Sequence, residues 1–277
     1  RNDVRIGYDM INQIADSYRK IRNTFKFILG NIADFDETIA VPYDELTDVD
    51  KWILHKLYVM YSQVIEAYEN FEFHMVYRRI LNFCAVELSS IYFDISKDIL
   101  YIEEKNSLRR RSTLTVLNEV YKTLVTLIAP ILSFSSEEIW NFAKNKGSVH
   151  QQQYYAPSKT FLNEKIAKDM EELVDVKKDV LKALEMKRKQ KEIGTSVEAH
   201  VEIFVKSERL RKMLRELGEE ARRFFQVSSM IINDKKEEGM FDGEVSSVKV
   251  YKAPGVKCLR CWNYTEDVGK NSSHPQL

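Results

Sequence analysis

Two cysteines near the C-terminal end of the sequence have the spacing of metal ligands. Cys258 and Cys261 form a C-x-x-C pair within the segment KCLRCW. Two thiolates at this spacing can turn inward on a tight turn and occupy two corners of a zinc tetrahedron, about 2.3 Å from the metal. The neighbouring Lys257 and Arg260 favour the thiolate form. A structural zinc needs four ligands, and His274 is the only histidine or cysteine further along the chain, so it supplies at most a third.

The same cysteine pair permits two other interpretations. A redox-active pair normally opens a helix that follows a strand, and the context of KCLRCW is loop-like instead. The two cysteines could also be free and inert, and residue types alone favour zinc only slightly over this alternative. The third cysteine, Cys84, lies within an apolar helical pattern and is predicted to be buried.

Positive charges cluster at several places, with aromatic residues nearby. Lys and Arg bind phosphates, and unpaired RNA bases stack on aromatic rings and on Arg planes. Trp262 follows the cysteines where there is little core to bury it, which makes it a candidate for base stacking, whereas Trp52 and Trp140 lie on apolar helix faces and are predicted to be core. A single cluster is more typical of a solvated face than of an RNA contact, and it is the presence of several clusters with aromatic residues nearby that favours recognition of single-stranded loops. The candidate RNA contacts are Arg5, Arg19, Arg22, Arg78, Arg79, Lys187, Arg188, Arg260 and Trp262.

No motif in the sequence indicates a self-contained active site. The glycine-rich phosphate loops, the nucleophile elbow and the H-E-x-x-H metal motif are all absent. The 42 basic and 42 acidic residues give no net formal charge, which argues against a wholly non-specific nucleic-acid binder. Local basic patches remain possible, since counter-ion release depends on the charges at the contact face.

Four long amphipathic helices are predicted in the first half of the chain. The first has an apolar seam, the second begins after Thr47 or Asp48, and the third runs from about residue 72 towards residue 94. The fourth begins after Asn106 or Ser107, breaks at Pro130 and is capped again by Ser135 or Ser136. Long helices with short connections favour an antiparallel bundle. The seam of the first helix consists of Ile11, Ile14, Tyr18, Ile21, Phe25 and Ile28.

The pattern changes after about Lys146. The segment GSVHQQQYYAPSKTFLN has no helical period and is interpreted as a connection, and a helix follows from about Asn163 to Glu192, ended by Gly194. Alternating apolar residues then predict a strand over residues 197–205, a short helix before Gly218, and two further strands. The predicted fold is mainly α: a helix bundle over residues 1–148, a connection, long helix and small α/β subdomain over 149–248, and a zinc-knuckle segment over 249–277.

Composition also bounds the cellular location. Three cysteines in 277 residues do not make a disulfide framework, and no apolar run is long enough to cross a bilayer. The first residues, RNDVRIGYDM, contain neither an initiating Met nor the features of a signal peptide. We therefore expect a cytoplasmic protein of which this chain is a fragment, a monomer with no membrane or DNA partner.

Several phrases of the sequence resemble one family, the isoleucyl-tRNA synthetases of the bacterial type. Three segments resemble the anticodon-binding helices of this family: IADSYRKIRNTFKFILGNIADFD, DKWILHKL and RRSTLTVLNEVYKTLVTLIAPILSFSSEEIW. A fourth segment, EIGTSVEAHVEI, is similar to the entry into the C-terminal subdomain, and KCLRCW is similar to the start of the zinc knuckle. The helix phrases are partly shared with valyl- and leucyl-tRNA synthetases, so the corresponding region of such an enzyme is an alternative, as is a helical protein-interaction scaffold.

The resemblance implies a class I ligase that joins isoleucine to its tRNA with ATP. The HIGH-type and K-M-S-K-S signatures are absent from this chain, so ATP and Mg²⁺ would belong to a catalytic domain that it lacks, and the editing domain is also missing. The chain would be the anticodon-recognition portion, with isoleucine tRNA as its partner and no catalytic residues of its own. The family's knuckle is completed by a second C-x-x-C, so the remaining zinc ligands are expected beyond Leu277.

Overall fold

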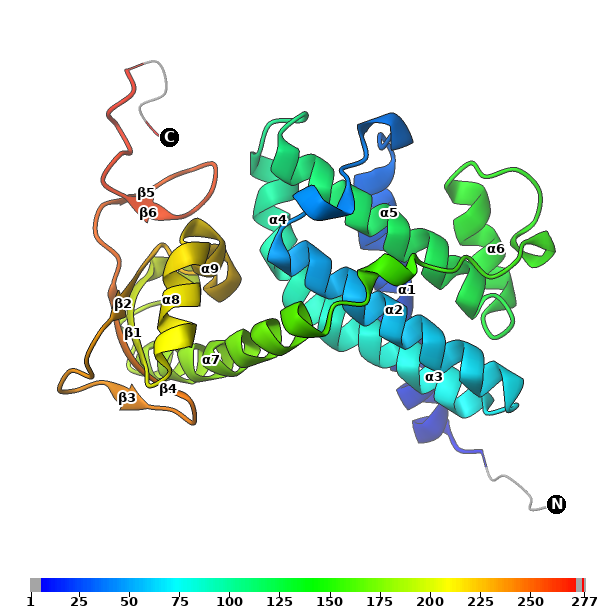
Figure 1. Ribbon diagram of the computed structural model, residues 1–277, viewed down its shortest axis with the longest axis horizontal. Coiled ribbons are helices and arrows are strands. Elements are labelled where there is room, and N and C mark those ends of the chain that lie inside the picture. The colour runs from blue at the N-terminus through cyan, green and yellow to red at the C-terminus, as the bar shows by residue number, and fades with distance from the viewer. Residues whose placement is uncertain (1–5, 273–275, 277) are drawn as a thin grey trace. The chain divides into compact units, whose positions relative to one another are not determined.

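The computed structural model describes residues 6–272 and 276 of the chain, which divides into two compact units, Arg1–Ala167 and Lys168–Leu277 (Figure 1). The first unit is a bundle of long helices, and the second is a small sheet with helices packed against it. Each unit is described by itself below.

The helix bundle contains α1, α2 and α5 together with a long helix made of α3, η3 and α4. Short 3-10 helices connect these elements. The bounds are α1 (Tyr8–Ile32), η1 (Glu37–Ile39), η2 (Tyr43–Glu45), α2 (Asp48–Glu69), α3 (Phe73–Asn82), η3 (Phe83–Tyr92), α4 (Phe93–Ile102), α5 (Leu108–Ile128), α6 (Ser133–Phe142), η4 (Val149–Gln151) and η5 (Lys159–Phe161).

Side-chain caps fix the starts of two central helices. The Thr47 hydroxyl accepts a hydrogen bond from the backbone N–H of Asp50 at 3.2 Å, and the Ser107 hydroxyl accepts one from Arg110 at 3.2 Å. Each cap satisfies an N–H that the helix cannot pair internally. The sequence predicted both starts. The core between the helices is apolar and includes the fully buried side chains of Trp52, Phe25, Phe83, Ile53, Leu54 and Leu57.

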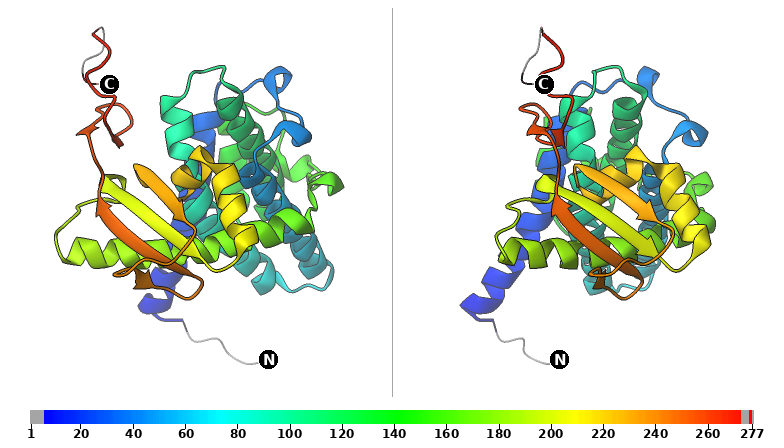
Figure 2. Two further views of the ribbon diagram at one scale, coloured as in Figure 1. Left: turned by 60° about the vertical axis from the view of Figure 1, so that its left-hand side comes forward. Right: turned by 90° about the vertical axis from the view of Figure 1, so that its left-hand side faces the viewer.

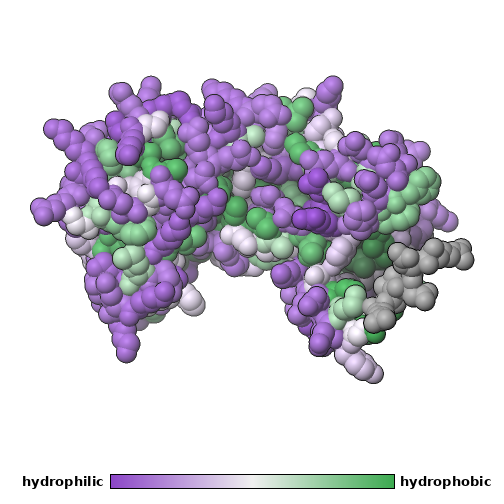
Figure 3. All heavy atoms as spheres, turned by 90° about the horizontal axis from the view of Figure 1, so that it is seen from below, coloured by the Kyte–Doolittle hydropathy of each residue, from purple (hydrophilic) through white to green (hydrophobic). Residues whose placement is uncertain are grey.

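The predicted apolar seam of α1 is buried only in its second half. Ile21, Phe25 and Ile28 are at most 1% exposed, as expected, whereas Ile11 and Ile14 are 49% and 62% exposed. The N-terminal part of α1 therefore presents partly exposed apolar side chains, and Figure 3 shows green hydrophobic surface among the hydrophilic surface of the face seen from below. The prediction of a core position is wrong for these two isoleucines, because helical periodicity identifies an apolar face and not its partner.

The third predicted helix continues eight residues beyond its predicted end. Its middle, η3, is a π-helix in which the hydroxyls of Ser89 and Ser90 donate to the carbonyl oxygens of Cys84 and Ala85, five residues earlier. The wider turn changes the phase of the apolar face. As a result Val86, one of the apolar positions in the helical pattern over residues 72–94, is 45% exposed.

The break at Pro130 is present, but its details differ from the prediction. Helix α5 ends at Ile128 and α6 begins at Ser133, with Leu132 at the capping position. Neither Ser135 nor Ser136 recaps the helix. Ser136 is fully buried inside it, and Ser135 is hydrogen-bonded to the Tyr18 hydroxyl at 3.0 Å.

The second unit is a four-stranded sheet in the order β2-β1-β4-β3, followed by a separate two-stranded hairpin. Strand β1 is central, parallel to β2 and antiparallel to β4. Figure 2 shows the strands side by side with helices packed against them. The bounds are α7 (Glu164–Lys189), η6 (Ser196–Glu198), β1 (Ala199–Val205), α8 (Glu208–Leu217), α9 (Glu219–Phe225), β2 (Ser229–Asn233), β3 (Phe241–Asp242), β4 (Ser246–Lys252), β5 (Val256–Lys257) and β6 (Tyr264–Thr265).

Most elements of this unit match the sequence pattern. Alternate residues of β1 are buried, and α8 begins at the Ser207 cap and ends before Gly218, which has a φ of 47°. Helix α7 begins after Asn163, whose side chain accepts from the Ile166 N–H at 3.1 Å. It ends at Lys189, ahead of Gly194, so the glycine does not terminate it as predicted.

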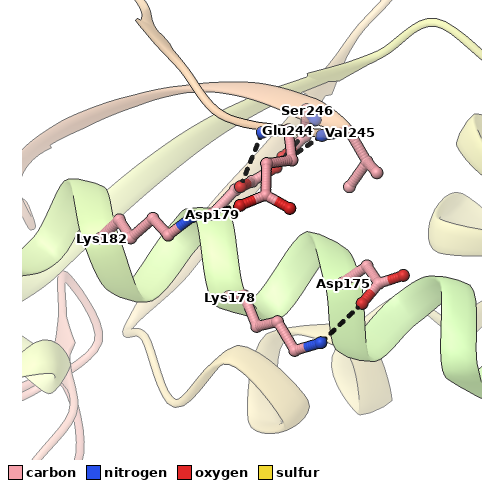
Figure 4. A network of polar contacts seen from close by, with 7 residues as sticks. All are labelled: Asp175, Lys178, Asp179, Lys182, Glu244, Val245 and Ser246. Atoms are coloured by element: carbon pink, nitrogen blue, oxygen red, sulfur yellow. Dashed lines mark hydrogen bonds and ion pairs between the residues drawn. The ribbon is translucent and has the colours of Figure 1, made fainter.

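A buried carboxylate ties α7 to the loop before β4 (Figure 4). Asp179 is 1% exposed, and its two oxygens accept the backbone N–H groups of Glu244, Val245 and Ser246 at 2.9–3.0 Å. The Ser246 hydroxyl donates a fourth bond at 3.1 Å. Burial alone would raise the pKa of Asp179, but these four donors outweigh it and hold the pKa below its ordinary value. A Cβ on Gly243 would lie 2.1 Å from the Asp179 carboxyl carbon, so a glycine is needed there.

The predicted fold class, a mainly α helix bundle followed by a small α/β region, is confirmed. Along the chain, the boundary between the two compact units lies between residues 167 and 168. The domain division predicted from the sequence, after residues 148 and 248, remains a prediction. None of the helices in the described part of the chain is both long and apolar enough to cross a membrane.

Candidate functional site

The cysteine pair lies on the turn of the hairpin formed by β5 and β6. The Cys258 N–H donates to the Asn263 carbonyl at 2.9 Å, and the Trp262 N–H donates back to the Cys258 carbonyl at 2.9 Å. The hairpin is joined to the body of its unit by the Ser228 hydroxyl, which accepts the Tyr264 N–H at 2.7 Å. This hydrogen bond links the short hairpin to residues outside it in the same unit.

Two unusual backbone conformations shape this turn. Gly255 has a φ of 89°, and a Cβ there would lie 2.3 Å from the backbone of Thr265. Trp262 itself has a φ of 63°, in the left-handed region that non-glycine residues rarely adopt. The Trp262 side chain is 61% exposed, and the Lys257 ammonium lies 4.6 Å from the centroid of its ring. The exposed ring has the geometry that base stacking requires, with a cation beside it.

The sulfurs of Cys258 and Cys84 differ in their electrostatic surroundings. Burial raises the pKa of the Cys84 thiol to about 12, which leaves it a protonated core residue as predicted. Burial would also raise the pKa of Cys258, but the backbone N–H groups of Cys261 and Arg260 and the thiol of Cys261 donate towards its sulfur and lower the pKa below its usual value. The lowered pKa makes the thiolate, which is the form that binds a metal, more accessible at Cys258 than at an ordinary thiol.

Cys258 and Cys261 could supply two of the four ligands that a structural zinc needs. Cys258 and Cys261 provide thiol sulfurs on one turn, and the donor groups around Cys258 suit a metal-bound thiolate. Residues 6–272 and 276 contain no group of three or more His, Cys, Asp or Glu side chains that could hold a metal ion. His274, the third ligand considered from the sequence, lies outside the described residues.

The RNA contacts predicted in the helix bundle lie on two helices. Arg19 and Arg22 are exposed on α1, and Arg78 and Arg79 are exposed on α3. Arg19 is paired with Asp16 one turn before it, which reduces the charge that it offers to a phosphate. Arg22 lines a cleft between α1 and α6. Arg5 lies outside the described residues.

The contacts predicted in the second unit lie at the end of α7 and on the hairpin. Lys187 is ion-paired with Glu192 at 2.8 Å, and Arg188 with Glu185 at 3.7 Å. Arg260 is exposed beside Cys261 and Trp262. The charges of Lys187 and Arg188 are therefore partly neutralised by acidic neighbours. The roles of all the candidate contacts in binding RNA remain predictions.

A large cleft in the helix bundle was missed by the sequence reasoning. It has a volume of about 1220 Å³ and is lined by α5, the end of α6 and the Gln- and Tyr-rich segment 151–156. Trp140, predicted to be core, is half-buried in its wall, with its indole N–H donating to the Gly147 carbonyl at 3.1 Å. The composition of the segment GSVHQQQYYAPSKTFLN was the available signal, because amides and tyrosines gathered in a loop are typical of a binding surface and not only of a connection.

The chain matches two family models in succession. Residues 50–203 match the anticodon-binding domain of tRNA ligase, and residues 255–277 match the zinc finger found in FPG and IleRS. Since the first match spans more than half of the chain, the protein belongs to the family of tRNA ligase anticodon-binding domains. The second match includes Cys258 and Cys261.

The curated relatives are more specific. The chain is 40% identical over 279 residues to the isoleucine–tRNA ligase of Brachyspira hyodysenteriae, covering 100% of this chain and 30% of that protein. It is 39% identical to the enzyme of Fervidobacterium nodosum and 41% identical to isoleucine–tRNA ligase 1 of Oceanobacillus iheyensis, each match covering 99% of this chain and 30% of the relative. The chain thus spans about 30% of the length of these relatives, and the resemblance to isoleucyl-tRNA synthetases is confirmed.

Proposed function

We propose that this chain is the anticodon-recognition portion of an isoleucine–tRNA ligase, an enzyme that joins isoleucine to its tRNA with ATP. The observation that carries the proposal is the succession of an anticodon-binding match and a zinc-finger match along one chain, in a protein whose relatives are isoleucine–tRNA ligases. ATP and Mg²⁺ would act in the part of the enzyme that this chain does not span. The location that fits this function is the cytoplasm.

The binding surface of this proposal combines cations for phosphates with rings for bases. Arg22, Arg78 and Arg79 are exposed, and none of them forms an ion pair with another residue of the described part of the chain. Trp262 offers an exposed ring beside a lysine. Phosphate contacts supply affinity that falls with salt, and contacts to unpaired bases supply selectivity.

Filter binding of the chain to isoleucine tRNA and to an unrelated tRNA across a salt series tests the proposal. We expect tighter binding to isoleucine tRNA and a linear fall of log K with log salt concentration. Replacing both arginines in Arg78→Ala/Arg79→Ala should reduce the slope by about 2, roughly 1 for each phosphate contact. Lys159→Ala, an exposed lysine outside the predicted contacts, is the matched control and should leave the slope unchanged. Equal affinity for both tRNAs at moderate salt would contradict the proposal and favour a protein-interaction scaffold.

We further propose that Cys258 and Cys261 bind a structural zinc, with the remaining ligands outside the described residues. The lowered pKa of Cys258 and the N–H groups directed at its sulfur support this assignment. The two cysteines would hold the ion, whose role is to fix the hairpin that carries Arg260 and Trp262.

The zinc proposal can be tested with Co²⁺, which takes the place of zinc and absorbs visible light when thiolates bind it. Addition of Co²⁺ to the reduced chain should produce thiolate-to-metal absorbance, which Zn²⁺ abolishes by competition. Cys258→Ser should remove the absorbance, and Cys84→Ala should retain it, because the Cys84 side chain is fully buried in the apolar core of the helix bundle. Absorbance that survives Cys258→Ser would exclude the assignment, and reversible disulfide formation without metal binding would favour the redox alternative.

A further inference from the structure

Two clefts in the helix bundle meet at the side chains of Leu29 and Phe142. The larger has a volume of about 1220 Å³ and the smaller about 440 Å³, and both residues line both clefts. Phe142, the last residue of α6, is 70% exposed on the ridge between them. A site of two connected parts around an exposed ring can hold a ligand with two chemically different parts. We call this pair of spaces the Phe142 clefts.

The smaller of the Phe142 clefts is cationic on its α1 side. Arg22 and Lys26 line it one turn apart, both exposed and neither in an ion pair within the described part of the chain. Tyr18 lies one turn before Arg22, with its hydroxyl 3.0 Å from that of Ser135. Glu138 is the acidic residue among the lining side chains. Two cations against one carboxylate leave a positive balance that suits a phosphate.

The larger cleft is rich in side-chain amides and aromatic rings. Its walls include Trp140 and Tyr155, with Gln151 and Gln153 exposed at its edge. No hydrogen bond within the described residues engages the side-chain amides of these two glutamines. An amide offers a donor and an acceptor side by side, which matches the edge of a nucleobase, and aromatic rings stack on its face.

The rings of the larger cleft are held in place before any ligand arrives. The Tyr155 hydroxyl donates to Glu119 at 3.0 Å, and its backbone N–H donates to the Thr126 hydroxyl at 3.0 Å. Tyr154 stacks on Tyr68 with ring centroids 5.5 Å apart. Side chains that are already fixed lose little conformational freedom on binding, so these rings offer a prepared surface.

We propose that the Phe142 clefts hold one unpaired nucleotide of the bound RNA, with its phosphate at Arg22 and Lys26 and its base in the larger cleft. This inference rests on the proposed binding of tRNA, and it assigns one nucleotide of that tRNA to a specific site on the helix bundle. The exposed cations of the smaller cleft suit a phosphate, and the larger cleft, whose lining also includes Glu37, Lys122 and Lys144, supplies the amides and rings that suit a base. Single-stranded RNA is read in this way, by stacking, amide contacts and a cationic path for the backbone.

Binding of isoleucine tRNA to variants of the whole chain tests this place. Phe142→Ala should weaken binding roughly 5- to 150-fold, the range that loss of one stacked base produces. Phe134→Ala is its matched control, because Phe134 lies on the same helix, is 93% exposed and lines neither cleft. Arg22→Ala should lower the salt slope by about 1. The exposed Lys20 on α1, also outside the clefts, provides the control Lys20→Ala.

Photo-crosslinking separates a direct contact from an indirect effect. A tRNA carrying 4-thiouridine at its unpaired positions should crosslink to peptides from residues 140–156, and Gln151→Ala/Gln153→Ala should reduce the yield. If the unaltered chain binds no tRNA, the proposed function itself fails. If it binds tRNA but Phe142→Ala behaves like Phe134→Ala and no crosslink falls in residues 140–156, the function stands and this place for the nucleotide is wrong.

Discussion

Both the helix bundle and the α/β unit have an apolar core, and both contain buried polar contacts, such as the Tyr92 hydroxyl donating to the Asp50 carboxylate at 2.6 Å in the bundle. The two units differ in what their polar contacts link. In the bundle, the centre is apolar, with Trp52, Phe25 and Phe83 nearly inaccessible to solvent. In the α/β unit, polar anchors link distant segments: the Asp179 carboxylate binds three consecutive N–H groups, and the Ser228 hydroxyl holds the cysteine hairpin. Apolar packing tolerates a change of pH, whereas an ionised anchor does not. The two units should therefore respond differently to the same perturbation.

The largest effect is expected from a cavity in the bundle. Leu57 on α2 is fully buried, and Leu57→Ala removes buried apolar surface and leaves a void. The loss should be about 2–5 kcal/mol in the free energy of opening of α2 and α5. Hydrogen–deuterium exchange resolved by peptide measures this opening in each unit separately. Peptides from residues 199–252 should be unaffected, and a similar loss there would mean that the two units unfold as one.

A smaller, pH-dependent effect is expected at the polar anchor. Asp179→Asn replaces an acceptor-only group with an amide whose NH₂ faces N–H donors, at a cost of about 1–3 kcal/mol to the α/β unit at pH 7. The pKa of Asp179 is lowered from 3.8 in the folded state. The carboxylate thus stabilises the fold above about pH 4 and loses this contribution as the pH falls through the lowered pKa.

The same exchange experiment at pH 7 and at pH 3 checks the sign of this dependence. The difference between the original chain and Asp179→Asn should narrow at the lower pH, because asparagine does not titrate. The Leu57→Ala difference should stay nearly constant between the two pH values. If the destabilisation caused by Asp179→Asn were the same at both pH values, the negative charge of Asp179 would not be the source of its stabilising effect.

The smallest effects are expected from a matched pair of helix caps. Ser107 caps α5 in the bundle and Ser207 caps α8 in the α/β unit, each accepting the N–H three residues later, at 3.2 and 3.3 Å. Ser107→Ala and Ser207→Ala should each cost about 1 kcal/mol. Peptide-resolved exchange should place each loss in the unit of its own helix. If either substitution lowered the stability of both units, the two units would not respond independently.

Local patterns predicted much of this fold, because they depend on neighbours in sequence. The caps at Thr47 and Ser107, the alternation of β1 and the glycine after α8 all follow from backbone chemistry within a few residues. The cysteine pair was found in the same way. What failed was the assignment of partners. Ile11 and Ile14 continue the apolar face of α1 into solvent, and the π-helix turned Val86 out of the core.

Contacts between distant segments could not be predicted from those patterns. Asp179 sits in a charged helix where a solvated carboxylate is the ordinary expectation, yet its partners lie 65–67 positions further along the chain. The clefts around Phe142 likewise combine α1, α5, α6 and the segment 151–156. Trp140 was assigned to the core because its helix is amphipathic. Its place in the wall of a cleft depends on the following loop, where the Gly147 carbonyl accepts the indole N–H.

The order of the strands has a consequence for the way in which the protein is made. Strand β1 lies at the centre of the sheet, but its antiparallel partner β4 is the last of the four strands to be synthesised. Until Ser246 has left the ribosome, one edge of β1 is unpaired and Asp179 lacks its donors, whereas the bundle can already pack through contacts earlier in the chain. While the C-terminal unit is being synthesised, the unpaired edge of β1 is open to misassociation, and a chaperone that covers exposed strand edges would act at this stage.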